Sequence, residues 1–369
     1  MYSQNELDEA VAAGAISADS AAALRNYIEG QRSLPSADEE QFRLITGFND
    51  IFVAIAAAIL LFAVGFIGQW IGQQAGLAVD GEGPSFLAPL AVAAASWGLA
   101  LFFTARRRMA LPSILLLLAF VGSVFATVGF ALVQVIGEPP ADQEGMYIGI
   151  VAAASGAIAA AAAWLHWKRF RVPITVATGA AAVSAIAVGL LIAVVGDPEP
   201  YQNLLLGFVL LLGVATFLFA MWWDSSDRAR VTRRSDVAFW LHLLAAPMIV
   251  HPVFTLLGLN DGNATIGEGF IVILLYVVIG FAALAIDRRA LLVSALAYVL
   301  YALNEMFRQF GAVELNVALT ALVIGSALLM LSAFWSQARS VVVRPLPEGL
   351  RERLPLVNRP AAVSPQPAA

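Results

Sequence analysis

The feature that most constrains this chain is a series of ten apolar blocks, each about twenty residues long and separated by short polar stretches. A helix of that length rises about 30 Å, which matches the hydrocarbon thickness of a bilayer. Of the 369 residues, 60% are hydrophobic and 13% are charged, which is too apolar for a water-soluble fold. We therefore predict an all-α, polytopic transmembrane bundle of about ten helices. The predicted spans are residues 48–71, 86–104, 112–136, 146–165, 173–195, 204–222, 237–257, 270–286, 290–310 and 315–334.

The polar ends of the chain predict two further regions beside a transmembrane domain at residues 47–336. Residues 1–46 contain two short amphipathic stretches, with Gly14 placed to end the first helix and Ser17 to cap the second. We expect a small cytoplasmic helical hairpin followed by a linker, and no cleaved signal peptide. Residues 337–369 combine scattered arginines with many prolines, so we expect a disordered cytoplasmic tail.

Loop charges indicate the orientation of the spans, because Lys and Arg in short loops stay on the cytoplasmic side. Alternate loops are basic, and the loops between them contain no Lys or Arg and are acidic instead. The pattern predicts cytoplasmic N- and C-termini. The basic set is Arg106, Arg107, Arg108, Lys168, Arg169, Arg171, Arg228, Arg230, Arg233, Arg234, Arg288 and Arg289, and the acidic set is Asp80, Glu82, Glu138, Asp142, Glu144, Asp197, Glu199, Asp261, Glu268 and Glu314.

Ionisable residues inside a predicted span are costly in hydrocarbon and are therefore candidates for function. The ninth span contains Asn304, Glu305, Arg308 and Gln309. Glu305 and Arg308 are three residues apart, so they share one face of a helix and can neutralise each other. Two interpretations remain open: a structural or interfacial ion pair near the membrane surface, and a substrate or ion site.

The seventh span contains two histidines, His242 and His251, together with Pro247 and Pro252. Nine residues at 100° each place the two rings on opposite faces, about 13.5 Å apart along the helix, so they are not expected to share a metal ion. Each histidine is either a packing residue or a proton carrier. The prolines favour a broken helix of the kind that lines transporter cavities.

The first span ends in glycines at short spacing, which let another helix approach closely. We predict Gly65, Gly68, Gly72 and Gly76 as helix-packing positions. Packing within the chain is the first interpretation, a dimer interface the second and a polar pore lining the third.

Several classes of chemistry find no support in the sequence. The chain has no cysteine, no glycine-rich phosphate loop and no zinc-binding pair of histidines. We therefore predict no enzyme activity, no metal, no cofactor and no nucleic-acid partner. The expected surroundings are the lipid bilayer, and the candidate protein partners are a second copy of the chain and a cytoplasmic protein.

The N-terminal region resembles a known group of proteins in two places. One is Leu7 to Ile28, with the sequence Ala-Gly-Ala-Ile-Ser at residues 13–17 and Tyr27-Ile28 at its end, and the other is residues 43–52, Arg-Leu-Ile-Thr-Gly-Phe-Asn-Asp-Ile-Phe. Both are similar to a domain-of-unknown-function family of bacterial polytopic membrane proteins that carry an N-terminal helical hairpin. The resemblance implies a bacterial inner-membrane location and brings no binding or catalytic residues.

Ten spans with short loops, a polar cluster and a proline-containing helix favour a transporter or permease of a small solute or ion. The alternative is a non-transporting scaffold, assembly or sensory protein that acts through its cytoplasmic hairpin.

Overall fold

The computed structural model describes residues 11, 13–24, 48–137, 139–230, 232–259, 266–309 and 316–356, without the side chains of residues 141, 266, 290, 305–309 and 316. The chain divides into two compact units. One is Arg43–Pro355, and the other combines Met1–Phe42 with Leu356–Ala369. All the long helices belong to the first unit.

Ten helices, α3 to α12, lie at the positions of the ten predicted spans, and the described residues contain no β-strand. This confirms the all-α class. The helices are α3 (Phe48–Gln74), α4 (Leu87–Phe103), α5 (Ala110–Ile136), α6 (Glu144–Phe170), α7 (Ile174–Val195), α8 (Gln202–Ser225), α9 (Arg233–Leu256), α10 (Ile266–Ile286), α11 (Ala290–Gln309) and α12 (Asn316–Ala333). Two short helices follow, α13 (Trp335–Val343) and α14 (Glu348–Arg351).

Length and hydropathy make this a multi-pass membrane protein. Among the described residues, 7 helices are long and apolar enough to cross a bilayer, and α12 with α13 makes an eighth if the bent pair is one span. The apolar segments Leu87–Phe103 of α4 and Leu291–Asn304 of α11 are shorter. Their crossing, and with it the total of ten spans, stays a prediction.

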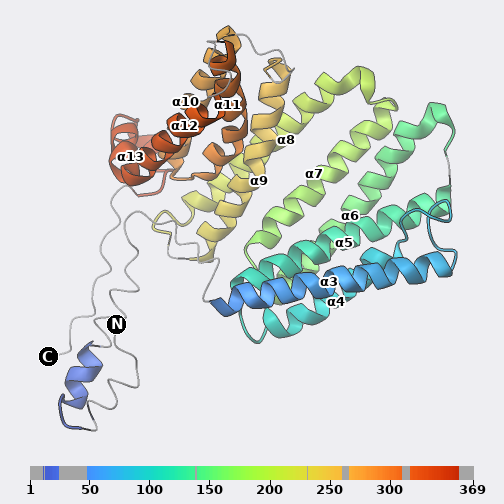
Figure 1. The fold of residues 1–369 in the computed structure, drawn as a ribbon, viewed down its shortest axis with the longest axis horizontal. Helices are drawn as coiled ribbons and strands as arrows, with labels where there is room; N and C mark the ends of the chain where they lie inside the picture. Colours follow the sequence, from blue (N-terminus) through green and yellow to red (C-terminus); the bar gives the residue numbers. More distant parts are fainter. Residues whose placement is uncertain are drawn as a thin grey trace. The chain divides into compact units, whose positions relative to one another are not determined.

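Most helices that are neighbours in sequence pack against one another, as Figure 1 shows for α3 with α4 and for α10 with α11. The exception is α9, which packs against α11 rather than α10. The helices α3 to α7 form one such series and α8 to α13 form another. The helix α7 links the two series because it packs against α6 on one side and against α8 and α9 on the other. Apolar side chains of α7, α8 and α9 fill this junction, with Ala177, Ala220 and Leu241 at its centre.

Three of the four predicted packing glycines lie against α4 or the residues before it. A Cβ atom added to Gly68 would lie 2.7 Å from the carbonyl oxygen of Leu87, one added to Gly72 would lie 2.0 Å from Ser85 Oγ, and one added to Gly65 would meet Val92 at 3.1 Å. Gly76 differs from the prediction: it follows the end of α3 with a φ of +69°, and a Cβ there would meet nothing within 4 Å. It serves the turn, because glycine adopts positive φ without steric cost.

The helices α6 and α7 approach each other closely at two glycines. A Cβ atom on Gly149 would lie 2.3 Å from the backbone nitrogen of Ala193, and one on Gly189 would lie 2.7 Å from the backbone nitrogen of Ala153. Both glycines therefore face the backbone of the opposite helix. Small residues at such a crossing bring two membrane helices together without a polar contact.

The C-terminal region differs from the predicted disordered tail. We define the C-terminal segment as residues 335–355, of which 335–343 and 348–351 are helical. It begins after a bend of 75° between α12 and α13. Trp335, Val343 and Leu354 are buried in one apolar cluster with residues of α9, α10 and α11. The prolines end helices without unfolding this region, because its apolar residues find a core. Residues 357–369 lie outside the described residues.

The second unit is described at residues 11, 13–24 and 356. Gly14 has a φ of +69°, and Ser17 Oγ accepts a hydrogen bond from the Ser20 backbone nitrogen at 3.0 Å, at the start of a helical stretch over residues 18–24. This is the geometry expected for a helix stop followed by an N-cap. The rest of the predicted hairpin and its linker lie outside the described residues.

Candidate functional site

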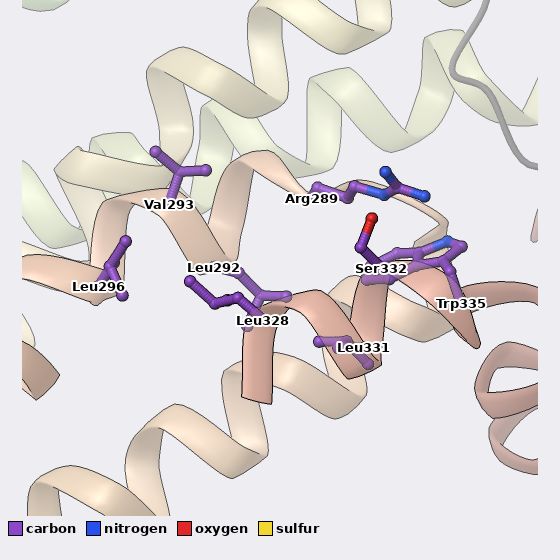
Figure 2. Close-up of a pocket in the computed structure, with 8 residues that line it drawn as sticks. All are labelled: Arg289, Leu292, Val293, Leu296, Leu328, Leu331, Ser332 and Trp335. Atoms are coloured by element: carbon purple, nitrogen blue, oxygen red, sulfur yellow. The ribbon is translucent and has the colours of Figure 1, made fainter. Parts of the chain in front are cut away.

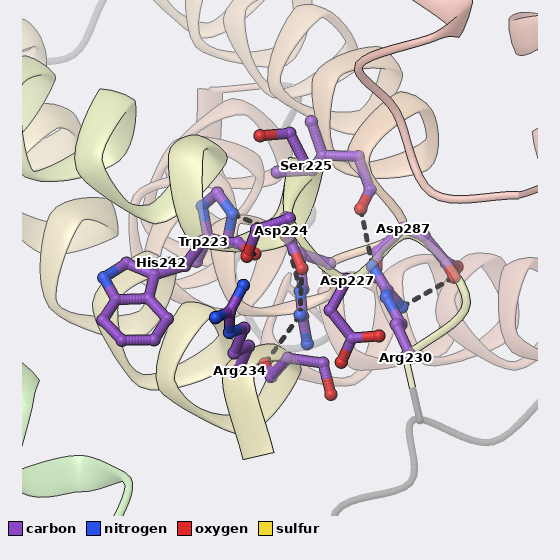
Figure 3. A network of polar contacts seen from close by, with 12 residues as sticks. Trp223, Asp224, Ser225, Asp227, Arg230, Arg234, His242 and Asp287 are labelled. Atoms are coloured by element: carbon purple, nitrogen blue, oxygen red, sulfur yellow. Dashed lines mark hydrogen bonds and ion pairs between the residues drawn. The ribbon is translucent and has the colours of Figure 1, made fainter. Parts of the chain in front are cut away.

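The strongest concentration of buried charge lies where α8 ends, near the beginning of α9 and in the turn between α10 and α11. Asp224 and His242 each have 0% of their surface exposed, and Arg288 has 3%. Charged groups in such surroundings must be paired and hydrogen-bonded to remain ionised. Figure 3 shows His242 beside Asp224, and Arg230 beside Asp287. We call Asp224, Arg230, His242, Asp287 and Arg288 the charge cluster.

Asp224 is the centre of the first half of this cluster. Its Oδ1 lies 2.6 Å from Nη2 of Arg288, and its Oδ2 lies 3.3 Å from Nε of the same arginine. The guanidinium therefore binds the carboxylate through two nitrogen atoms, the arrangement in which arginine pairs most strongly. Nη2 of Arg288 also donates to the backbone carbonyl of Ser235 at 2.9 Å. One side chain from the α10–α11 turn thus ties α8 to α9.

His242 supplies the other partner of Asp224, with Nε2 lying 3.0 Å from Oδ2. An ionised carboxylate only accepts hydrogen bonds, so Nε2 carries the proton in this contact. The second ring nitrogen, Nδ1, is buried and has no hydrogen-bond partner among the described residues. The site therefore holds an imidazole with one nitrogen hydrogen-bonded to a carboxylate and the other buried without a partner among the described residues.

The short turn between α8 and α9 is held by its own side chains. Asp227 Oδ2 accepts from the backbone nitrogen of Thr232 at 2.9 Å and from its hydroxyl at 2.6 Å. The Thr232 hydroxyl oxygen in turn accepts from the Arg234 backbone nitrogen at 3.2 Å and caps α9. Arg230 takes a left-handed conformation with φ of 55°. This fixes the distance between Asp224 and His242, which lie on the two helices that the turn connects.

Asp287 is the centre of the second half of the cluster. Its Oδ2 lies 2.8 Å from Nη1 of Arg230, and its Oδ1 accepts from Nε1 of Trp335 at 2.7 Å. Arg339 of α13 lies 3.7 Å away and adds a second positive charge. Arg230 also donates to the backbone carbonyl of Ile286 at 2.9 Å. These contacts join the α8–α9 turn, the α10–α11 turn and the start of the C-terminal segment.

Two arginines fasten the far end of the C-terminal segment to the same region. Arg228 donates to the carbonyl of Leu354 through Nε and to that of Arg351 through Nη2, both at 3.0 Å. Arg339, which is 4% exposed, donates to the carbonyl of Pro355 at 2.7 Å. The charge cluster is therefore in direct contact with the C-terminal segment, so a rearrangement of the cluster would alter the contacts of that segment.

The two histidines predicted as candidates have separate partners, as the spacing requires. His251 Nδ1 lies 2.6 Å from the hydroxyl of Tyr298 on α11, in an exposed position. The helix α9 continues through Pro247 and Pro252 from Arg233 to Leu256, so the predicted break in this span is wrong. The turn of helix before each proline holds because neighbouring helices pack around it.

The predicted polar site on α11 lies far from the charge cluster. Asn304 is fourteen residues after Ala290, which is about 21 Å along the helix from the α10–α11 turn. Asn304 is partly buried. The side chains of Glu305, Arg308 and Gln309 lie outside the described residues, so their pairing stays a prediction.

The sequence analysis did not predict that Asp224, Asp287 and Arg288 belong to a buried site. Arg288 was assigned only to loop charge, and the two aspartates were not considered. A signal was present, because Asp224, Asp227 and Asp287 are acidic residues next to loops that are otherwise basic. Acidic residues that oppose the charge of their own loop indicate partners elsewhere in the fold.

The third histidine, His166, was also missed. It is 0% exposed and lies among the rings of Trp97, Phe120 and Phe170, with centroid distances from 4.6 to 6.1 Å. Its Nδ1 is 3.4 Å from the hydroxyl of Thr175. No group of three His, Cys, Asp or Glu within the described ranges is placed to hold a metal ion.

Comparisons with protein-family models, with curated proteins and with solved structures found no match.

Proposed function

We propose that this multi-pass membrane protein is a permease for a small solute or ion, in which the Asp224–His242 pair carries a proton during the transport cycle. The observation that carries the proposal is an imidazole inside the bundle with Nε2 on a carboxylate and Nδ1 without a partner in the described part of the chain. Ionisable groups in spans are costly, and buried His–Asp pairs are typical of proton relays.

The arrangement of the cluster supports a switch between two states. Arg288 and His242 bind the same carboxylate of Asp224. Protonation of His242 would place a second full positive charge beside Asp224 and weaken the ion pair between Arg288 and Asp224. Because Arg288 also holds α9 through Ser235, such a change would loosen α8, α9 and the α10–α11 turn together. Alternating access requires this kind of coupled release.

Ten spans, cytoplasmic termini and a bacterial inner membrane belong to the same proposal. The number of spans is supported by ten helices at the expected positions, and the orientation of the termini by the alternation of loop charge. The bacterial inner membrane rests only on the resemblance of the N-terminal region. The cluster would then lie toward the cytoplasmic side, because its turns contain the basic residues.

The test asks whether water reaches the buried cluster. Ala246 lies one turn after His242 on α9 and is 0% exposed. In a chain without cysteine, Ala246→Cys introduces the only thiol. A permease that opens is expected to let a membrane-impermeant thiol reagent label this cysteine in whole cells or everted vesicles. The matched control is Ala100→Cys on α4, another small residue in a core, at 1% exposed.

His242→Gln retains a donor for Asp224 but cannot carry a proton, so it is expected to change the labelling rate of Ala246→Cys by more than about tenfold. His251→Gln is expected to leave that rate unchanged. Protection of Ala246→Cys to the same extent as Ala100→Cys would overturn the proposal.

A second candidate, a sensory or scaffold protein, is favoured by one specific contact. The C-terminal segment is bound to the charge cluster through Asp287, Trp335 and Arg339. In this function, the segment would report the state of the bundle to a cytoplasmic protein. This function predicts that the cysteine of Ala246→Cys is not labelled by the thiol reagent. It also predicts loss of function when the chain is truncated after residue 343, although the bundle still folds.

A further inference from the structure

A groove of about 150 Å³ lies between α11 and α12, and Trp335 at one end of it contacts Asp287 of the charge cluster. Its walls are apolar, and one end carries polar groups. The wall residues are Leu292, Val293, Leu296, Leu328 and Leu331. Figure 2 shows Arg289, Ser332 and Trp335 together at one end and Val293 and Leu296 at the other.

The surface around the groove is apolar and exposed. Val293 on α11 is 65% exposed, and Leu322 and Leu329 on α12 are 65% and 73% exposed. Exposed leucine and valine on helices of a membrane protein face lipid tails, because contact with water would be unfavourable. The groove is therefore open to the hydrocarbon of the bilayer.

The polar end has the composition of a membrane–water boundary. The guanidinium carbon of Arg289 lies 4.8 Å from the ring centroid of Trp335. The ring is held in place because its Nε1 donates to Asp287 at 2.7 Å. Ser332, which is exposed, adds a hydroxyl group at the same end. Tryptophan and arginine gather at this level in membrane proteins because each has an apolar body and a polar tip.

We propose that the groove binds an anionic phospholipid, with one acyl chain between α11 and α12 and the phosphate beside Arg289 and Ser332. The occupant must be amphipathic, because the walls are apolar and one end is positively charged. A basic residue at the end of a groove between membrane helices selects anionic headgroups over zwitterionic ones. A groove of about 150 Å³ is small compared with a whole phospholipid, so it holds part of one chain. This proposal does not depend on transport.

The test is native mass spectrometry of the full-length protein in detergent, titrated with phosphatidylglycerol or phosphatidylcholine of equal chain length. We expect the wild type to retain one phosphatidylglycerol in preference to phosphatidylcholine by about fivefold. Arg289→Gln should bind the two lipids equally, and Arg289→Lys, which keeps the charge, should retain the preference. Val293→Trp should block the apolar end of the groove and weaken binding of both lipids.

Two matched controls separate the groove from general effects. Arg171 also lies over a tryptophan, with its guanidinium carbon 5.4 Å from the Trp167 ring, so Arg171→Gln removes a similar pair elsewhere. Leu322→Trp adds the same ring to an exposed position of α12 outside the groove. Both should bind lipid as the wild type does. Equal binding of the two lipids by the wild type, an unchanged preference in Arg289→Gln, or competition by inorganic phosphate alone would overturn the proposal.

Discussion

Replacing Arg288 with methionine tests whether the charge cluster holds the second series of helices together. The change removes both guanidinium contacts to Asp224, at 2.6 and 3.3 Å, and leaves a carboxylate that is 0% exposed with His242 as its remaining hydrogen-bond partner among the described side chains. Removing one partner of a buried ion pair costs about 3–5 kcal/mol, because the remaining charge cannot be solvated. Methionine retains most of the apolar stem, so the loss reports mainly on charge.

The double variant Asp224→Asn with Arg288→Met removes both charges and leaves an amide that can still accept from His242. Its free energy of unfolding should therefore lie about 2–3 kcal/mol above that of Arg288→Met alone. The assay is reversible unfolding by dodecyl sulfate in mixed micelles, followed by tryptophan fluorescence. Arg107→Met, at an exposed arginine of another basic loop, should stay within about 0.5 kcal/mol of the wild type. The reasoning is refuted if the double variant is as unstable as Arg288→Met, or less stable.

Three further outcomes follow from the fold. Gly149→Ala should destabilise the protein by about 1–3 kcal/mol in the same assay, because the added methyl group meets the backbone of α7. The control is Gly207→Ala, which should leave the free energy of unfolding unchanged because nothing lies within 4 Å of the added methyl group. Trp335→Phe should speed tryptic cleavage of the C-terminal segment, because it loses a hydrogen bond to a carboxylate that contributes about 1.5–3 kcal/mol; unchanged cleavage would count against this anchor. Single cysteines at Asp80 and Arg107 should be labelled from opposite sides of the membrane; labelling of both from one side would exclude α4 as a span.

The positions of the helices could be predicted because each membrane helix is a continuous apolar stretch of about twenty residues, which is visible in the sequence itself. Each predicted span matches a helix from α3 to α12 within a few residues. Whether α4 and α11 cross the bilayer is harder to predict, because about 17 residues is the lower limit for a span. The C-terminal segment was predicted wrongly for a related reason. Its fold depends on Trp335 and Leu354 meeting a core that other helices build.

The charge cluster could not be predicted from spacing within one helix. Asp224 and Arg288 are 64 residues apart, and Arg228 and Leu354 are 126 apart. Periodicity detects neighbours at three or four positions, as for Glu305 and Arg308, but it carries no information on which helix ends meet. The pair of histidines shows the same limit. Their separation on α9 was predictable, whereas the Asp224 partner of His242 was not.

The glycine contact between α6 and α7 has a consequence for how the protein can move. At Gly149 and Gly189 the two helices meet through backbone atoms, which cannot absorb a shift by changing rotamer, so we expect α6 and α7 to move together as one rigid unit. The opposite face of α7, by contrast, meets α8 and α9 through side chains such as Ala177 and Leu241. A rearrangement between the two series of helices therefore has its sliding surface on that face, and α6 is carried along with α7.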